Sequence, residues 1–413
     1  MKIAILSQSY PPMISGAALF SERLAADLSA RGHEVLVLTA SERNYAHRSN
    51  DGNLVVERFR SCRNPFRADQ RFALWPHRQI LKCLAEFAPD VIHIHDPLQF
   101  AISSLSFSRS RNIPVILTIH QLPWFVGASL PLGVGIRIMV ENGLWCYARW
   151  LLKRCSHTVV ATQTIAGLVF AHTGIYPQAI SCGVSLTTFF PAYSSSFQAA
   201  HLRDRLGIPE DAPIILYVGR LDKDKQVKRI IRVASLVLLQ TPAHLLIVGD
   251  GTERADLEQY CTRLGIGERS HFTGFVSIED GLPALYQIST VFVTASEIET
   301  QGLVLLEAAA SGLPIVAVQA TCLHEIVHEG ANGYLLRSGD QIGMAERISE
   351  LLKDPDRAHE MGQAGRLIVE SHAAERTLTA YEDLFSTAIQ KAHKNYFSQS
   401  DLPDRSTCSN ETG

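Results

Sequence analysis

Residues 2–40 read KIAILSQSYPPMISGAALFSERLAADLSARGHEVLVLTA. Two short apolar runs, KIAILSQ and EVLVLTA, are typical of strands that are buried on both faces of a parallel sheet. Between them, residues 17–31 carry apolar side chains at helical spacing, and Gly32 follows as a helix C-cap. Strand, helix and strand in this order form a βαβ unit, so the stretch predicts a doubly wound α/β layer.

The same alternation continues along the chain in two series. The first series adds NLVVERF, DVIHIHD, PVILTIH and HTVVAT before residue 165, and the second comprises PIILYVG, AHLLIVGD, SHFTGFV, VFVTAS, PIVAV and GYLL. Residues 192–212 between them contain a serine cluster and no strand-like run, which is typical of a linker. We therefore predict two doubly wound, Rossmann-like domains that face each other across a ligand-binding cleft.

The length of 413 residues fits two domains. We expect an N-terminal domain over residues 1–191 and a C-terminal domain over residues 192–374. A helix over residues 375–393 would cross back to the first domain, and the polar residues 394–413 are expected to be disordered.

The composition, with 46% hydrophobic and 19% charged residues, is typical of a soluble globular protein. The formal net charge of −3 argues against nucleic acid as a partner, because nucleic-acid binders usually carry a basic excess. No charge-free apolar run reaches the length of a membrane-spanning helix, and the N-terminal residues lack the apolar core of a secretory signal. The eight cysteines form no CxxC pair. We expect them to be reduced in a cytoplasmic protein.

Three loops carry side chains that suit a phosphorylated ligand. Gly16 precedes the first helix, whose N-terminus favours a phosphate, although the glycine could serve only the turn. Arg220 and Lys225 follow the buried strand PIILYVG and could converge on a diphosphate. The alternative is a solvated charge run in which Asp222 and Asp224 neutralise the cations.

Two carboxylates and a histidine are further candidates. Glu299 lies in the loop after VFVTAS, and Glu307 lies in the next helix among apolar residues. Glu307 needs hydrogen-bond donors there, either ligand hydroxyls or neighbouring protein groups. His120 ends the strand PVILTIH, where it is either a functional group or a structural hydrogen-bonding residue. The turn Gly249-Asp250-Gly251 lacks the third glycine of a dinucleotide fingerprint, and a tight turn explains it equally well.

These motifs together resemble family-four retaining glycosyltransferases of the GT-B fold over about residues 1–390. The resemblance rests on the PP-x3-G loop, the PDVIHIHD and PVILTIH strands, the GRL-x3-K turn, and the Glu299-x7-Glu307 element followed by Ala-Ser-Gly-Leu-Pro. It departs from the family at Ser15-Gly16, where Gly-Gly is frequent, at Cys182-Gly183-Val184-Ser185, where Asn-Gly-Val-Asp is usual, and at Gln226, where Gly or Asn is usual. These departures weaken the assignment of a particular sugar.

The resemblance implies a role for each matching residue. Arg220 and Lys225 would hold the diphosphate of a nucleotide sugar, and Glu307 would accept hydrogen bonds from the ribose. Glu299 would contact the donor sugar together with backbone N–H groups of Thr300, Gln301, Gly302 and Leu303. Gly16 would let its loop approach the phosphate, and His120 would lie beside the reacting sugar. The family retains the anomeric configuration without an established protein nucleophile. It implies no cofactor and no DxD metal site.

Glu-Thr-Gln-Gly-Leu resembles the members of this family that glycosylate lipids, such as diacylglycerol glucosyltransferases. Two segments agree with an anionic membrane surface as partner. Residues 58–82 hold seven basic residues and one acidic residue, with Phe59, Phe66, Phe72 and Trp75 between them. Residues 122–152 contain Pro123-Trp124-Phe125-Val126, Trp145 and Trp150, with Arg137, Arg149, Lys153 and Arg154 in or beside them. An ordinary helix pair with a solvated basic face is the alternative.

We therefore predict an enzyme that transfers a hexose from a nucleotide sugar to a membrane lipid such as diacylglycerol, with UDP-glucose as the expected donor. The enzyme would be bound peripherally at the cytoplasmic face of the membrane. A transferase that makes polysaccharide or small-molecule glycosides is the alternative. A nucleotide-sugar epimerase would need no acceptor, and a scaffold would only bind the nucleotide sugar. The presence of Arg220, Lys225, Glu299 and Glu307 argues against a scaffold. A dehydrogenase is disfavoured because neither half contains a full GxGxxG motif.

Overall fold

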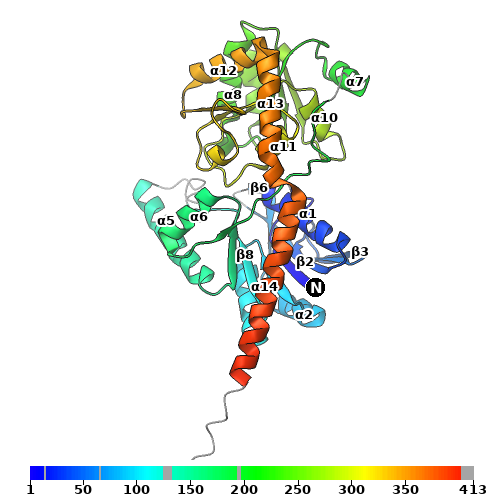
Figure 1. Cartoon of the computed structure of the whole chain (residues 1–413), viewed down its shortest axis with the longest axis vertical. Coiled ribbons are helices and arrows are strands. Elements are labelled where there is room, and N and C mark those ends of the chain that lie inside the picture. The colour runs from blue at the N-terminus through cyan, green and yellow to red at the C-terminus, as the bar shows by residue number, and fades with distance from the viewer. Residues whose placement is uncertain (14, 65–66, 124–132, 193–196, 401–413) are drawn as a thin grey trace, which may run out of the picture. The chain divides into compact units, whose positions relative to one another are not determined.

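A computed structural model describes residues 1–13, 15–64, 67–123, 133–192 and 197–400 (Figure 1). The chain divides into two compact units. Unit 1 contains residues 1–160, residues 166–180 and the chain from residue 378 onward, and unit 2 contains residues 161–165 and 181–377. Within the described residues, no helix is both long and apolar enough to cross a bilayer.

Unit 1 is built on a largely parallel sheet. Its strand order is β10-β9-β8-β7-β1-β2-β4-β3, and only β3 runs antiparallel to its neighbour. All six apolar runs predicted in this half are strands. The strands are β1 (Lys2–Ser7), β2 (Glu34–Ala40), β3 (His47–Asp51), β4 (Leu54–Phe59), β7 (Val91–Ile94), β8 (Val115–Thr118), β9 (His157–Val160) and β10 (Gln178–Ala179), and β5 (Ser61–Asn64) pairs with β6 (Arg67–Ala73) in a separate hairpin.

Helices cover both faces of this sheet because its strands are apolar on both sides. On one face, buried residues of β1, β2 and β7 pack with Ile80, Phe100 and Leu151. These residues come from α2 (His77–Phe87), α3 (Gln99–Arg109) and α5 (Val134–Leu152). On the other face, Phe20 of α1 (Gly16–Ala30) packs against Tyr381 of α14 (Ala374–Ser400).

Unit 2 has a six-stranded parallel sheet in the order β13-β12-β11-β14-β15-β16. The predicted runs of this half are again all strands: β11 (Ile214–Val218), β12 (His244–Val248), β13 (Ser270–Gly274), β14 (Val291–Thr294), β15 (Ile315–Val318) and β16 (Gly333–Leu336). Around them lie α8 (Val227–Leu238), α9 (Arg254–Arg263), α10 (Leu282–Gln287), α11 (Leu303–Ala310), α12 (Gln341–Lys353) and α13 (Pro355–Val369). Both units are therefore doubly wound, as predicted.

Three boundaries differ from the prediction. The first domain ends at residue 180 and not at 191, because the following residues pack in unit 2, where Arg366 donates to the Phe189 carbonyl at 2.6 Å and to the Leu186 carbonyl at 2.9 Å. The predicted linker contains α7 (Phe197–Leu206), whose Arg203 binds the Ile288 carbonyl at 2.7 Å. Helix α14 continues to Ser400, beyond the predicted end at residue 393, and residues 401–413 lie outside the described part.

The strand orders locate where ligands bind. In each unit the order reverses beside the first strand, between β11 and β14 in unit 2 and between β1 and β7 in unit 1. Open parallel sheets bind ligands at the carboxyl ends of the strands at such a reversal point. The loops that follow these four strands are therefore the places to search for a functional site.

Candidate functional site

Lys225 and Glu299 form an ion pair at the reversal point of unit 2. The Lys225 Nζ lies 2.6 Å from the Glu299 Oε1 and 3.4 Å from the Ser296 hydroxyl. Lys225 ends the short 3-10 helix η1 (Lys223–Lys225) after β11, and Glu299 lies in the loop after β14. The two side chains are 20% and 15% exposed, so the pair is accessible to a ligand. The structure thus brings together two residues that the sequence predicted separately.

The Arg220 guanidinium is bound by the two acidic residues of its own turn. It pairs with Asp222, and its Nη2 lies 3.0 Å from the Asp224 Oδ2. Asp222 also accepts hydrogen bonds from the backbone N–H and hydroxyl of Thr252. The neutralised arrangement considered as the alternative is therefore the one that the structure contains, and a diphosphate would have to replace these carboxylates.

Asp222-Lys223-Asp224 has the spacing of a DxD motif, although no such motif was expected. Both carboxylates bind Arg220 in the structure. Among the described residues, no group of three or more His, Cys, Asp or Glu side chains could hold a metal ion.

The turns after β11 and β12 pack backbone against backbone. The Leu221 N–H donates to the Asp250 carbonyl at 2.9 Å, and a Cβ on Gly249 would lie 1.9 Å from the Gly219 carbonyl oxygen. The glycines of Gly249-Asp250-Gly251 are thus required by this close approach. The tight-turn interpretation is favoured over a dinucleotide site.

Glu307 accepts a hydrogen bond from a buried tyrosine. The Tyr286 hydroxyl lies 2.8 Å from the Glu307 Oε2, and Tyr286 is fully buried. Burial, with the carboxylate beside it, raises the pKa of Tyr286 well above its usual value. Glu307 itself is half-buried. The tyrosine therefore satisfies part of the carboxylate and fixes its direction. No sequence pattern singled out Tyr286, because it lies 21 positions before Glu307 and meets the carboxylate only in the folded chain.

The segment from Thr300 to Leu303 leads into α11. Gly302 is the N-cap with φ of 81°, a left-handed conformation that favours glycine. The Gln301 side chain is buried, accepts from the Cys182 N–H at 2.7 Å and donates to the Ser181 hydroxyl at 2.7 Å. Gln301 thus anchors this loop by its side chain. The role predicted for residues 300–303 concerns their backbone N–H groups, and those that open a helix suit a polar or anionic ligand.

In unit 1, Gly16 is the first residue of α1 and is exposed. The hydroxyl of the N-cap residue Ser15 accepts from the Ala18 N–H at 3.1 Å. The serine that departs from the family's Gly-Gly therefore caps the helix. Gly16 leaves the first helical position without a side chain.

His120 belongs to a buried cluster of histidines. Its Nε2 lies 2.7 Å from the Nδ1 of His95, and the two rings stack with centroids 5.0 Å apart. The His93 ring is tilted by 51° against the His95 ring, with centroids 4.2 Å apart, and its Nε2 lies 2.7 Å from the Thr118 hydroxyl. Burial lowers the pKa of His120 to about 4 and that of His93 to about 3, so these imidazoles are neutral at pH 7.

His95 and Asp96, which follows it, were not among the predicted site residues. Asp96 is buried, accepts from the Leu98 N–H at 3.0 Å, and has a pKa raised to about 6 by burial. A usable signal exists in the sequence: His93-Ile94-His95 and Thr118-Ile119-His120 place alternate polar residues on neighbouring buried strands. Alternate strand residues share a face, so such a pattern indicates a polar cluster.

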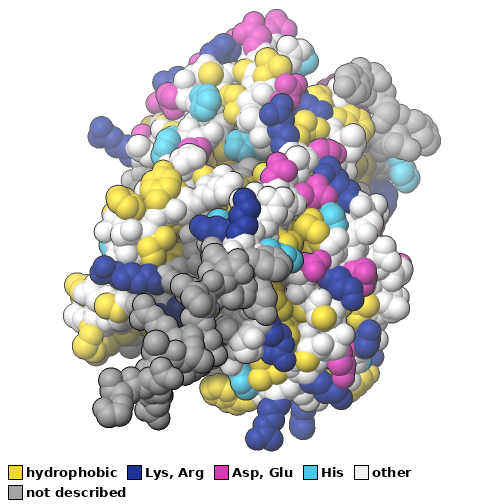
Figure 2. Space-filling model, turned by 60° about the horizontal axis from the view of Figure 1, so that its bottom comes forward, with side chains coloured by type: hydrophobic (Ala, Val, Ile, Leu, Met, Phe, Trp, Pro, Cys, Tyr) yellow, Lys and Arg dark blue, Asp and Glu magenta, His cyan; other side chains and the backbone are white. Residues whose placement is uncertain are grey.

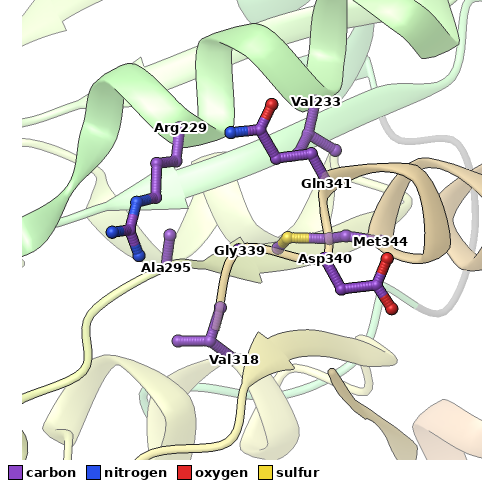
Figure 3. A pocket seen from close by; sticks show the side chains of 8 residues that line it. All are labelled: Arg229, Val233, Ala295, Val318, Gly339, Asp340, Gln341 and Met344. Atoms are coloured by element: carbon purple, nitrogen blue, oxygen red, sulfur yellow. The ribbon is translucent and has the colours of Figure 1, made fainter. Parts of the chain in front are cut away.

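A small pocket lies elsewhere in unit 2 (Figure 3). Its lining includes the apolar side chains of Val233 and Met344 and the polar side chains of Arg229, Asp340 and Gln341. Arg229 is paired with Glu297 and binds the Ser338 hydroxyl at 3.2 Å. None of the residues predicted to bind the donor lines this pocket.

Comparisons with known proteins identify the family of the chain. The model "Glycosyltransferase Family 4" matches residues 14–188, and "Glycosyl transferases group 1" matches residues 199–368. An alpha-monoglucosyldiacylglycerol synthase of Acholeplasma laidlawii is 25% identical over 95% of this chain and 99% of its own length. An N-acetyl-alpha-D-glucosaminyl L-malate synthase of Bacillus anthracis is 26% identical over 94% of this chain and 98% of its own.

A solved structure of Anabaena Alr3699/HepE in complex with UDP has a TM-score of 0.73 at 20% identity, with 94% of this chain and 100% of that one covered. This likeness concerns the fold. The two family models together span both units and meet the residues that carry the Glu-x7-Glu element and the Arg–Lys turn. The chain therefore belongs to the family-four glycosyltransferases of the GT-B fold.

Proposed function

We propose that this glycosyltransferase moves glucose from UDP-glucose to the hydroxyl group of a membrane lipid such as diacylglycerol, with retention of the anomeric configuration. The observation that carries the transfer reaction is the Lys225–Glu299 pair at the reversal point between β11 and β14, with Glu307 on the helix that follows. A cation for the diphosphate and carboxylates for hydroxyl groups are the groups that a nucleotide sugar requires.

In the proposed mechanism the diphosphate takes the place of the carboxylates on Lys225 and Arg220. Glu299 is then released to accept hydrogen bonds from hydroxyl groups of the sugar, and Glu307 accepts from the ribose. The bond from the anomeric carbon to the diphosphate oxygen breaks, and a bond from the same carbon to the acceptor oxygen forms on the same face. The acceptor proton passes to the departing diphosphate. The protein contributes positioning and stabilises the charge of the leaving group.

Two kinds of observation support a lipid acceptor. The relative from Acholeplasma laidlawii is by name a synthase of an alpha-glucosyl diacylglycerol. UDP-glucose is itself an alpha-linked donor, so an alpha product corresponds to retention. The first two turns of α5 also expose apolar side chains: Val134 is 76% exposed and Met139 is 68% exposed. Exposed apolar side chains on a helix suit burial in a bilayer interface.

Cations accompany these apolar side chains. Arg137, Arg149 and Lys153 of α5 and its C-cap are all exposed, and so are Arg60 and Arg78 of the basic stretch. Figure 2 shows Lys and Arg side chains scattered among apolar and acidic ones on one face of the molecule. The predicted contributions of Phe66 and Trp124–Val126 lie outside the described side chains. Each cation near an anionic bilayer contributes about 1 kcal/mol.

A second candidate is the glycosylation of a small hydroxy acid. The relative from Bacillus anthracis is by name a synthase of N-acetyl-alpha-D-glucosaminyl L-malate, and it covers nearly as much of the chain as the lipid synthase does.

A donor and acceptor panel separates the candidates. The full chain is incubated with UDP-glucose, UDP-N-acetylglucosamine or GDP-mannose, with diacylglycerol vesicles or malate as acceptor, and products are read by mass spectrometry. The proposal expects glucosyl diacylglycerol from UDP-glucose. A malate glycoside without a lipid product would replace it by the second candidate, and no release of nucleotide diphosphate with any pair would contradict both.

Vesicle binding tests the membrane part separately. Met139→Asp in α5 should weaken binding to vesicles of anionic lipid roughly tenfold or more, because it removes an apolar contact and adds a repelled charge. Leu367→Asp in α13 is the matched control, since both side chains are 68% exposed. Co-sedimentation measures both. Equal loss in the two variants, or equal pelleting of the native chain with neutral vesicles, would contradict electrostatic binding through α5.

A further inference from the structure

Two neighbouring strands of unit 1 end in a shared pattern of polar side chains. β7 leads into His93-Ile94-His95, and β8 leads into Thr118-Ile119-His120. The strands are parallel, with Ile94 opposite Leu117. Alternate residues of a strand share one face, so the polar side chains of both strands meet on the same side of the sheet.

The two pairs of contacts in this cluster are distinct. His95 Nδ1 lies 2.7 Å from His120 Nε2, with an angle of 15° between the stacked rings. His93 Nε2 lies 2.7 Å from the Thr118 hydroxyl, which in turn lies 3.0 Å from the Tyr381 hydroxyl. His95 is therefore the histidine that holds the His120 ring, while His93 belongs to the chain that leads to α14.

The hydrogen bond between His95 and His120 fixes where their protons lie. His95 is buried and His120 is half-buried, and the loss of solvent around them lowers both pKa values far enough to keep the rings neutral at pH 7. Two neutral imidazoles form one hydrogen bond only if one ring supplies N–H and the other a bare nitrogen. Either His95 donates from Nδ1, or His120 donates from Nε2 and the proton of His95 moves to its own Nε2.

The surroundings of His95 decide between these two arrangements. Its Nε2 is buried and has no hydrogen-bond partner among the described residues. Buried N–H groups without an acceptor are rarer in proteins than acceptors that lack a donor. The arrangement without an orphaned N–H has the proton of His95 on Nδ1, so His120 accepts at Nε2 and carries its own proton on Nδ1.

We propose that His95 is a positioning residue that holds His120 as the neutral Nδ1–H tautomer and leaves this N–H to donate to an oxygen of the donor sugar. The side chain of His120 keeps partial exposure, and its Nδ1 edge lies opposite the bond to His95. The role of His95 rests on the proposed function of His120. His120 then orients the sugar and takes no proton from the acceptor.

Nuclear magnetic resonance tests the tautomer without any substrate. The full chain is labelled with ¹⁵N-histidine, and two-bond ¹⁵N–¹H spectra at pH 7 report which ring nitrogen carries the proton, with His120→Asn used to assign the signal. The expected result is an Nδ1–H tautomer for His120 in the native chain and a mixture of tautomers in His95→Leu. An Nε2–H tautomer in the native chain would overturn the proposal, whatever reaction the enzyme catalyses.

Kinetics test the consequence for catalysis. His95→Leu should lower kcat roughly 10- to 100-fold at a nearly unchanged KM for the nucleotide sugar, because the ring is misplaced rather than lost. His95→Asn should recover most of kcat, since the asparagine amide places an N–H near the position of Nδ1. His93→Gln, which keeps a side-chain amide to hydrogen-bond with the Thr118 hydroxyl, is the matched control and should retain kcat. Unchanged kcat in His95→Leu, or an equal loss in the control, would overturn the proposal.

A final pair of variants covers the case in which thermal unfolding shows that His95→Leu is not folded. An asparagine amide lies near the position of an imidazole Nδ1, and a glutamine amide lies near that of Nε2. His120→Asn should therefore retain more activity than His120→Gln. The reverse order would overturn the assignment of the Nδ1–H group to the sugar.

Discussion

Lys225 and Glu299 show what single residues contribute and how far they can be foreseen. Each was singled out by its place after a buried strand, and the structure joins them at 2.6 Å although 74 positions separate them in the chain. Tyr286, which contacts Glu307, and His95, which contacts His120, were not foreseen. Their roles depend on side chains that approach from other elements, and a pattern within one element does not contain that information.

The cation at the leaving group gives the sharpest prediction at this scale. Lys225→Ala should lower the release of nucleotide diphosphate roughly 100- to 1,000-fold, because a positioned charge that stabilises a leaving group contributes this much. Glu307→Ala should abolish release as well, through loss of donor binding. Arg229→Ala is the control, since it removes the nearby exposed pair with Glu297 without touching a proposed donor residue. Near-native release in Lys225→Ala, with the fold intact, would remove the diphosphate assignment.

The histidines of unit 1 also predict a pH dependence of stability. The pKa values of His93 and His120 in the folded chain are about 3 and about 4, below the usual value of 6.5. Above pH 6.5 neither state is protonated. As the pH falls below 6.5, the unfolded chain takes up protons that the folded chain refuses, so each histidine destabilises unit 1 by about 1.4 kcal/mol per pH unit.

Asp96 opposes this trend, because its pKa is raised to about 6 and the folded chain binds its proton first. Two histidines outweigh one carboxyl group, and His95 adds to them, since its pKa is lowered too. Amide hydrogen exchange of β7 and β8 between pH 6.5 and 4.5 measures the slope, with His93→Gln as the variant that should flatten it. An identical slope in native chain and variant would contradict the burial of neutral histidines.

At the scale of elements, burial explains which strands the sequence predicted. The central strands of each sheet are continuous apolar runs, because helices cover both faces of the sheet. Such runs can be recognised in a single sequence. β3 (His47–Asp51) is mostly exposed at the sheet edge, and it was not predicted. α7 was missed for a related reason: its short, polar sequence resembles a linker, and its Arg203 binds the carbonyl group of Ile288, which lies far away in the chain.

The packing of the turns after β11 and β12 predicts an unequal response of two glycines. Gly249→Ala places a Cβ 1.9 Å from the Gly219 carbonyl oxygen, so we expect a loss of about 3 kcal/mol or more in the free energy of unfolding. Gly330→Ala is the control, because its φ of 72° is also left-handed but its Cβ would meet nothing within 4 Å. There the cost should be about 1 kcal/mol. Equal losses by thermal or chemical unfolding would show that the turns separate easily.

At the scale of the whole molecule, the chain passes between its two units more than once. The segment 161–165 belongs to unit 2 although the residues on both sides of it belong to unit 1. The last helix, α14, begins in unit 2, where the Thr377 hydroxyl donates to the Ser181 carbonyl at 3.0 Å, and it belongs to unit 1 from Leu378 onward. The return of a C-terminal helix was predicted, whereas the short passage at 161–165 follows from contacts that no local pattern predicts.

This connectivity predicts that unit 1 depends on the end of the chain and unit 2 does not. Tyr381 and Phe385 are fully buried in unit 1, and Glu382 pairs with Arg31 and lies 2.8 Å from the Nε2 of His33. Loss of one buried aromatic side chain costs about 3–5 kcal/mol of the free energy of unfolding. Loss of both is therefore comparable to the whole free energy of unfolding of a typical domain, which is about 5–15 kcal/mol. A chain that ends after Thr377 keeps the Thr377–Ser181 contact, and we expect it to fold in unit 2 while unit 1 unfolds.

Hydrogen exchange distinguishes the two units directly. In the chain that ends after Thr377, the amides of β1, β7 and β8 should lose protection, and those of β11, β12 and β14 should keep it. A chain that ends after Ser400 is the matched control, because it retains every described residue of α14 and should protect both sheets. Protection of β7 and β8 in the shorter chain would mean that the sheet of unit 1 is stable without the aromatic side chains of α14, and loss of protection in both sheets would mean that the two units unfold together.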